Sequence, residues 1–233
     1  MLLIQDITKF TLQDYPENTA CIIWFSGCNL RCKYCHNPDI VNNHHKLFSE
    51  GTVLDFLIQR KGLLDGVVFS GGECTMSNGI FDFAKKVKEL GYKIKIDTNG
   101  INYNTIYNLV ESGIVDFVAL DFKSLESKFL FITQKDYFNK FNETLKYLVK
   151  KNNDNKIILE IRTTVHTDLL NENDINEMIK YLDEIGYRSN YFIQNFRNDH
   201  GNLLSELPDQ TCVLNKNKII SPKNFSIKYR NFF

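Results

Sequence analysis

The sequence predicts an α/β protein, a partial (β/α)6 TIM-like barrel, and three observations point to this fold class. Short apolar runs rich in β-branched and aromatic residues alternate with longer amphipathic stretches, which is the pattern of successive βαβ units. Runs such as VDFVALD are almost continuously apolar, as expected of parallel strands that are buried on both faces. Polar motifs follow the predicted strands, and ligands in such folds bind at those strand ends.

Six strands are expected, and helical stretches separate them. The strands cover residues 20–25, 66–70, 92–97, 115–121, 157–163 and 191–196. The stretch 78–90 has helical periodicity and can end at Gly91, and 173–185 repeats this design before Gly186. Because a closed barrel of this class needs eight units, six units predict an open or partial barrel.

Length and composition indicate one domain. The chain has 233 residues, of which 43% are hydrophobic, and this is enough for one sizeable core. We expect a single domain over residues 1–233, with the barrel core at about 18–200 and a C-terminal extension at about 201–233. The extension is too irregular for an element to be predicted in it.

The charge balance and the apolar runs exclude some partners. Basic and acidic side chains number 28 each, whereas nucleic-acid-binding domains usually carry a basic excess. No apolar run approaches the roughly 20 residues of a membrane span, and the N-terminus lacks the basic flank and cleavage site of an export signal. We therefore expect a cytoplasmic protein that binds neither nucleic acid nor membrane. In that reducing compartment its cysteines are metal ligands or buried thiols rather than disulfides.

Three cysteines lie close together in FSGCNLRCKYCHNP, at Cys28, Cys32 and Cys35. This C-x3-C-x2-C spacing has no fourth cysteine to complete a tetrahedral zinc site, and disulfides use cysteines in pairs. Three thiolates on an iron–sulfur cube leave one iron open to an exogenous ligand, so we interpret the loop as a cluster site. The alternative is zinc with His36 as the fourth ligand, although an adjacent Cys and His suit one tetrahedron poorly. Cys21 lies in an apolar strand and is expected in the core.

Four further polar motifs accompany the strands: SGGE, DTNG, LDFK and RTTVH. The glycines of SGGE allow a backbone to approach a ligand, and Glu73 can hold a cation or an ammonium group. Asp97 and Asp121 can bind a hard cation or act in acid–base chemistry. Taken singly, each of these carboxylates can equally serve a turn or cap. Arg162 lies inside an apolar strand and should pair with a carboxylate of the protein or of a ligand.

Together, CNLRCKYCHNP, SGGE, DTNG and LDFK resemble the radical S-adenosylmethionine (SAM) superfamily. The resemblance implies that the three cysteines bind a [4Fe–4S] cluster whose open iron is chelated by the methionine moiety of SAM. It also implies that Gly71, Gly72 and Glu73 hold the methionine ammonium group. Tyr34, between two of the cysteines, is expected to pack against the SAM ligand, with ordinary loop packing as the alternative.

The His and Asn after the third cysteine, together with TLQDYP, narrow the resemblance. The sequence is similar to the activating proteins of anaerobic ribonucleoside-triphosphate reductase, which are related to pyruvate formate-lyase activating enzymes. This similarity implies a monovalent-cation site formed by Asp97 and Asp121, with Thr98 beside them at the SAM carboxylate. It further implies that Arg162 contacts SAM.

The sequence departs from the family pattern at two positions. GGEP reads GGEC, which places Cys74 at a turn, and DYPG reads DYPE at Glu17. Cys74 is interpreted as a small turn residue, and the alternative is a thiol close to the cluster. The stretch between Cys35 and the GGE turn is too short for the ferredoxin-like insertion of some activating enzymes, so no second cluster is expected.

The activity implied by the resemblance is reductive cleavage of SAM to a 5′-deoxyadenosyl radical, which generates a glycyl radical on anaerobic ribonucleotide reductase. The expected partners are this glycyl-radical enzyme and an electron donor such as flavodoxin or ferredoxin. No side-chain acid or base is required, because the cofactors supply the reaction. Two alternatives remain: an enzyme acting on a small molecule, similar to 7-carboxy-7-deazaguanine synthase, and a zinc- or cluster-binding scaffold without activity.

Overall fold

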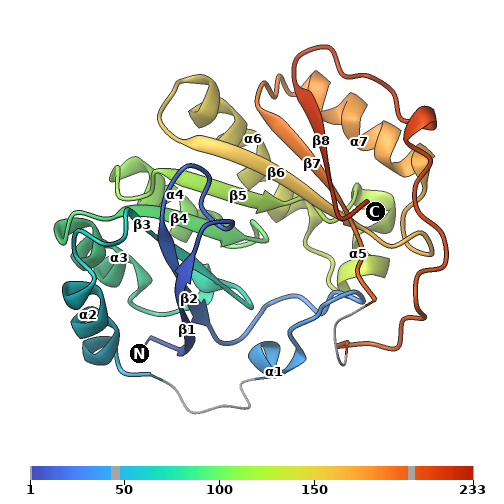
Figure 1. The fold of residues 1–233 in the computed structure, drawn as a ribbon. Coiled ribbons are helices and arrows are strands. Elements are labelled where there is room, and N and C mark those ends of the chain that lie inside the picture. Colours follow the sequence, from blue (N-terminus) through green and yellow to red (C-terminus); the bar gives the residue numbers. More distant parts are fainter. Residues whose placement is uncertain (1, 43–47, 199–202, 233) are drawn as a thin grey trace.

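A computed structural model describes residues 2–42, 48–198 and 203–232. Within these ranges the chain forms one curved eight-stranded sheet whose strands follow each other in space in the same order as in the sequence (Figure 1). The first two strands are antiparallel, and every later neighbour pair is parallel. The strands are β1 Ile4–Thr11, β2 Ala20–Phe25, β3 Gly66–Gly71, β4 Lys93–Thr98, β5 Phe117–Asp121, β6 Ile158–Val165, β7 Asn190–Asn195 and β8 Ser226–Arg230.

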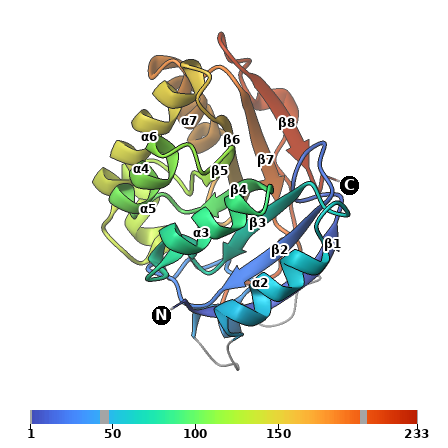
Figure 2. The same ribbon diagram turned by 90° about the vertical axis from the view of Figure 1, so that its left-hand side faces the viewer.

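Helices connect the parallel strands and cover the outer face of the sheet (Figure 2). They are α1 Pro38–Val41, α2 Glu50–Gln59, α3 Ile80–Glu89, α4 Tyr103–Glu111, α5 Glu126–Thr133, α6 Phe138–Asn153 and α7 Glu172–Glu184, with short 3-10 turns at Cys74–Met76 and Lys216–Lys218. The main apolar core lies between helices and sheet. A smaller apolar cluster that includes Ile22, Val68 and Ala119 occupies the concave side of the sheet. In the described part of the chain, no helix is long and apolar enough to cross a membrane.

The predicted fold class is confirmed, and the six expected strands correspond to β2–β7 within about two residues at each end. Two strands were not expected. The sequence of β1, IQDITKFT, is largely polar, and β8, SIKYR, is short and partly exposed. Both lie at the edges of the sheet, where one side of a strand is not covered by a neighbour and the apolar pattern weakens.

The C-terminal extension therefore contributes β8, which pairs with β7 from Asn190↔Ser226 to Gln194↔Arg230. Among the described residues no pairing joins β8 to β1, so the barrel is open on the side between these two strands (Figure 1). An open side matters for function, because it allows a large molecule to approach the concave face of the sheet.

The predicted helix ends agree with the backbone. Gly91 follows α3 with φ of 96° and Gly186 follows α7 with φ of 76°, a left-handed conformation that glycine adopts without a Cβ clash. The start of α7 is stabilised by a capping box, in which Asn171 and Asp174 each accept a backbone N–H of the other. These caps orient the βα units whose strand ends carry the polar motifs.

Candidate functional site

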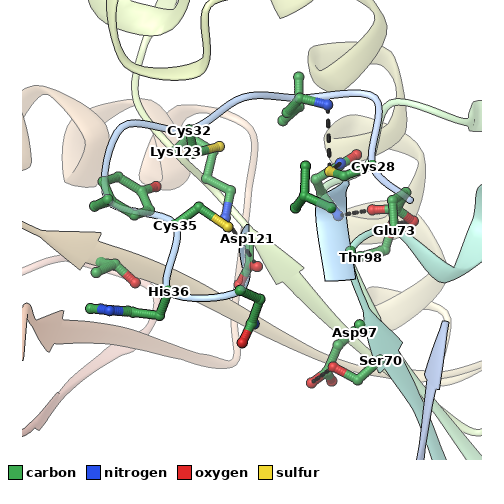
Figure 3. Close-up of a pocket in the computed structure, with 18 of the residues that line it drawn as sticks. Cys28, Cys32, Cys35, His36, Ser70, Glu73, Asp97, Thr98, Asp121 and Lys123 are labelled. Carbon is green, nitrogen blue, oxygen red and sulfur yellow. Dashed lines mark hydrogen bonds and ion pairs between the residues drawn. The ribbon is translucent and has the colours of Figure 1, made fainter. Parts of the chain in front are cut away.

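One cavity of about 320 Å³ lies at the carboxyl ends of the parallel strands (Figure 3). We call it the site cavity. It is lined by every residue that the sequence singled out for a site, although these residues come from four separate strands and one loop. They are Cys28, Cys32, Tyr34, Cys35, Gly71, Gly72, Glu73, Asp97, Thr98, Asp121 and Arg162.

The cysteine loop leaves the end of β2 and is held by backbone hydrogen bonds on both sides. Arg31 N and Lys33 N donate to the carbonyl oxygens of Thr133 and Ile132 at 3.0 Å each, which ties the loop to the last turn of α5. A turn closes where Cys35 N donates to Cys32 O at 3.0 Å. These contacts present the three thiols to the same cavity.

Burial affects the thiols strongly. It raises the pKa of Cys28 to about 12 and that of Cys32 to about 11, and the nearby Lys123 ammonium opposes the increase at Cys32. A bound metal centre favours thiolates, because its positive charge offsets their cost of burial. In the described ranges, no group of three His, Cys, Asp or Glu side chains is arranged to hold a single metal ion.

The glycines of the SGGE turn are explained by the backbone of the preceding strand. A Cβ atom on Gly71 would lie 2.1 Å from the carbonyl oxygen of Phe25, and one on Gly72 would lie 2.1 Å from that of Gly27. Gly72 N and Glu73 N donate to these same two oxygens at 2.9 Å. The backbone that these glycines approach within the chain is that of Phe25 and Gly27, where the cysteine loop begins, and their predicted approach to a ligand stays a prediction. The turn therefore positions that loop.

Glu73 is 1% exposed and accepts hydrogen bonds from the turn that follows it and from the end of β4. Its Oε1 accepts hydrogen bonds from the backbone and hydroxyl of Thr75 and, at 2.8 Å, from the hydroxyl of Thr98. Its Oε2 accepts from Asn99 N at 2.7 Å. Burial raises the pKa of Glu73 although these hydrogen bonds lower it. A cationic ligand in the cavity would relieve the cost of this buried charge.

Asp97 and Asp121 lie on either side of the Arg162 guanidinium group. Arg162 Nε donates to Asp121 Oδ1 at 3.0 Å, and its terminal nitrogen lies 3.5 Å from Asp97 Oδ2. This confirms that the arginine pairs with carboxylates. Burial raises the pKa of both aspartates, but Arg162 and neighbouring lysines outweigh it and hold both values below the usual range.

Two lysines in this network were not predicted as site residues. Lys95 pairs with Asp97, and Lys123 Nζ lies 3.1 Å from Asp121 Oδ2. Each lysine lies two positions from its aspartate in the sequence, and alternate residues of a strand share a face. That spacing was the sequence feature from which the two lysines could have been predicted as site residues. Ser70 and Asn99 also line the cavity, where the Ser70 hydroxyl donates to Asp97 at 3.3 Å.

The aromatic residues of the loop lie in the cavity wall. Tyr34 is 5% exposed, and its hydroxyl has no hydrogen-bond partner among the described residues. The Lys123 ammonium lies 5.6 Å from the centre of its ring. The His36 ring stacks on that of Phe196 with centroids 4.8 Å apart. A buried hydroxyl without a partner is uncommon and is suited to receive a polar ligand atom.

The remaining cysteines lie away from the cavity. Cys21 is fully buried in the apolar core, as predicted. Cys74 is also fully buried, its sulfur lies 3.4 Å from the backbone oxygen of Asp97, and it does not line the cavity. This placement agrees with a small turn residue. Cys212 is exposed.

The fold and the cavity define a class before any comparison: an α/β barrel protein with a thiol-lined ligand cavity at the carboxyl ends of its strands. The chain belongs to the radical SAM superfamily, because the sequence model of that family matches residues 22–194. A Methanocaldococcus jannaschii protein provisionally assigned as a glycyl-radical enzyme activating enzyme is 32% identical over 202 residues, which is 83% of this chain and 80% of the relative. The pyruvate formate-lyase-activating enzyme of Clostridium pasteurianum is 35% identical over 129 residues, 53% of each chain.

Solved structures share the fold at low sequence identity. Streptococcus suis SuiB bound to S-adenosylmethionine superposes with a TM-score of 0.56 at 19% identity, over 80% of this chain and 45% of that protein. The present chain thus spans less than half of SuiB, and the likeness concerns the fold alone. The cofactors of the radical SAM superfamily are a [4Fe–4S] cluster and S-adenosylmethionine, and the chain is related to the glycyl-radical enzyme activating enzymes.

Proposed function

We propose that this chain is an activating enzyme that uses a [4Fe–4S] cluster to cleave SAM reductively and generates a glycyl radical on an anaerobic ribonucleotide reductase. One observation carries the proposal: three thiols, a buried carboxylate and a paired arginine from separate strand ends line the same cavity. The related activating enzymes of M. jannaschii and C. pasteurianum support the class of reaction. The TLQDYP motif favours the reductase as the target.

The residues of the cavity fit the two cofactors. In the proposal Cys28, Cys32 and Cys35 ligate the cluster and leave one iron open, and thiolates are the usual ligands of such clusters. Glu73, whose burial is costly without a counter-charge, faces the ammonium group of SAM together with Gly71 and Gly72. The unpartnered hydroxyl of Tyr34 provides a hydrogen bond to SAM.

Arg162 and Thr98 complete the proposed SAM site. Arg162, Lys95 and Lys123 together carry one more charge than Asp97 and Asp121, so this network can accept the SAM carboxylate beside Arg162 without leaving it uncompensated. Thr98 holds Glu73 through its hydroxyl and therefore acts on SAM binding through that carboxylate. The protein's contribution is to bind, orient and exclude water.

A monovalent cation held by Asp97 and Asp121 is a further part of the proposal. Arg162, Lys95 and Lys123 surround these two carboxylates, so a bound cation requires one lysine to turn away. Lys123 is the candidate, because its contact with Asp121 is 3.1 Å and Asp121 is the more exposed aspartate, at 31%. SAM cleavage should then increase with potassium, and equal rates in potassium, sodium and choline salts would remove the cation from the proposal.

When bound, the reduced cluster supplies the electron that splits SAM into methionine and a 5′-deoxyadenosyl radical. The proposed target would lose one hydrogen atom from its glycine Cα to this radical, which would leave 5′-deoxyadenosine and a glycyl radical. Neither step needs a side-chain base. Glycine suits the reaction because it has no side chain to block close approach, and the open barrel can admit a loop of a larger protein from outside.

The experiment is anaerobic incubation of the protein with SAM, a flavodoxin or dithionite as electron donor, and the anaerobic ribonucleotide reductase encoded in the same genome. We expect a glycyl radical by electron paramagnetic resonance and 5′-deoxyadenosine in comparable amount. The matched control is a reductase whose target glycine is replaced by alanine. SAM cleavage with turnover of a small purine precursor, and no radical on the reductase, would favour the small-molecule alternative.

Metal analysis separates both enzymes from a scaffold. Protein purified without oxygen should contain about four irons with sulfide per chain. Stoichiometric zinc without iron would reject the radical chemistry altogether.

A further inference from the structure

A second hollow of about 650 Å³ adjoins the site cavity, and we call it the side cleft. Three of its residues, Trp24, His36 and Asn37, also line the site cavity, so the two hollows share a wall. The opposite wall is formed by Gln5, Asp6 and Thr8 of β1. Because β1 is an edge strand of the open barrel, the side cleft lies between the edge of the sheet and the proposed cofactor site.

A β-bulge places Gln5 in this wall. Ile4 pairs with Phe25 and Asp6 pairs with Trp24, so two steps along β1 match one step along β2 and Gln5 is the extra residue. A bulge interrupts the alternation of a strand and redirects a side chain, and bulges are frequent next to active sites. Here the bulge puts Gln5 next to Asp6 in the wall of the same cleft.

The side-chain oxygen of Gln5 is buried without a partner. Gln5 is 7% exposed, and its Oε1 makes no hydrogen bond to any described residue. Such an oxygen costs free energy in the folded protein, because the hydrogen bond it made to water in the unfolded chain is not replaced. The Trp24 indole N–H, which lines the same cleft, donates to the Thr8 hydroxyl at 2.9 Å.

We propose that Gln5 is a substrate-positioning residue, whose side-chain oxygen accepts a backbone N–H of an extended peptide segment that reaches the site cavity through the side cleft. This inference rests on the proposed function, in which the target is a glycine of a larger protein. A peptide suits the cleft because an extended segment presents N–H donors at regular intervals. Phe48 N already donates to Ile4 O at this edge of β1, so the Gln5 side chain, and not the β1 backbone, is the acceptor. A bulged, inward-turned glutamine selects one of them and so sets the register of the target glycine.

The test uses a synthetic peptide with the C-terminal glycine segment of the anaerobic ribonucleotide reductase encoded in the same genome, with deuterium on the glycine Cα. Deuterium that appears in 5′-deoxyadenosine, measured by mass spectrometry, reports transfer from this carbon. In Gln5→Leu we expect the KM for the peptide to rise about tenfold, with kcat at saturating peptide, iron content and SAM affinity unchanged. The control Gln59→Leu replaces an exposed glutamine at the end of α2 and should behave as wild type.

A second measurement distinguishes positioning from a structural role. The thermal midpoint of Gln5→Leu should equal or exceed that of wild type, since the variant removes a buried acceptor that has no partner. Peptides methylated at single backbone nitrogens should identify one position where methylation raises the KM of the wild-type protein about tenfold. The same methylation should leave the KM of Gln5→Leu unchanged, because the two changes remove the same contact.

The outcomes separate the two proposals. If wild-type protein transfers deuterium and Gln5→Leu has an unchanged peptide KM, or loses SAM affinity instead, the role of Gln5 is wrong and the proposed function stands. If wild-type protein cleaves SAM but takes no deuterium from the peptide, and the intact reductase acquires no radical, the proposed function itself fails.

Discussion

Gly72 lies against the backbone of Gly27, so that a Cβ atom on Gly72 would lie 2.1 Å from the Gly27 carbonyl oxygen. The residue after Gly27 is Cys28, and the residue after Gly72 is Glu73. The two halves of the proposed cofactor site therefore meet where Gly72 packs on Gly27, next to the similar contact of Gly71 with Phe25. Any side chain at position 72 must displace one half relative to the other.

Gly72→Ala should consequently lose most of its bound iron, and its rate of SAM cleavage should fall about 100-fold. A displacement of about 1 Å at a reactive site can reduce a rate by this factor. The measurements are iron content and 5′-deoxyadenosine formation. Gly51→Ala is the matched control, because a Cβ there meets only Ser49 Oγ at 3.9 Å. Full activity in Gly72→Ala would contradict the assigned role of this contact.

Serine in place of Cys28, Cys32 or Cys35 should abolish iron retention, because a hydroxyl does not replace a thiolate as a cluster ligand. Iron and sulfide analysis of anaerobically purified variants measures this. Cys212→Ser is the control at an exposed position, and Cys74→Ala is the control for a buried thiol outside the cavity. Loss of iron in Cys74→Ala with retained folding would instead place that thiol at the cluster.

Asp121→Asn should retain iron and lose about 10- to 100-fold in SAM cleavage. The change weakens hydrogen bonds from Arg162 and Lys123, and hydrogen bonds to charged groups contribute about 1.5–3 kcal/mol. Asp116→Asn is a control at the other end of the same βα unit, where Asp116 pairs with Lys88 at 2.7 Å. SAM binding by calorimetry should be reduced in the first variant and normal in the second.

Acid should destabilise the protein through the same aspartates. The pKa of Asp121 is lowered in the folded protein relative to its ordinary value of 3.8, so the unfolded chain binds more protons between these values. The stabilisation is complete above 3.8 and is lost as the pH falls through the folded pKa. The difference in free energy of unfolding between wild type and Asp121→Asn should therefore shrink from about pH 6 to about pH 3 in urea titrations. A free-energy difference that stays constant over this pH range would contradict the stabilising role of the ionised Asp121.

Glu17→Gly should stabilise the fold by up to about 1 kcal/mol. Glu17 has φ of 62°, a left-handed conformation that costs a non-glycine residue about 1–2 kcal/mol, and the greater freedom of glycine in the unfolded chain offsets part of the gain. Urea denaturation measures the change. Glu17→Ala keeps the Cβ and should bring no gain, so equal stabilisation by both variants would exclude the backbone explanation.

The sequence alone determined the parts of the fold that repeat a simple pattern. The strands β2–β7 could be predicted because they carry buried apolar residues, in a continuous run in β2 and at alternate positions in β4. Their motifs had to meet because the carboxyl ends of parallel strands share one rim. The edge strands β1 and β8 were not predicted, since exposure on one side removes the apolar pattern.

Only the tertiary structure decided what each site residue contacts. The glycines of the SGGE turn pack on the backbone that begins the cysteine loop. Asp97 and Asp121, from two different strands, pair with the same arginine and with one lysine each. The inward position of Gln5 depends on a β-bulge in β1, which the strand propensities of its residues do not predict. The physical reason is common to all three. Burial of a strand or helix follows from the order of apolar and polar residues in that segment alone. Close contacts and charge pairs form between segments distant in sequence and depend on the strand register, which is set by the packing of the whole sheet.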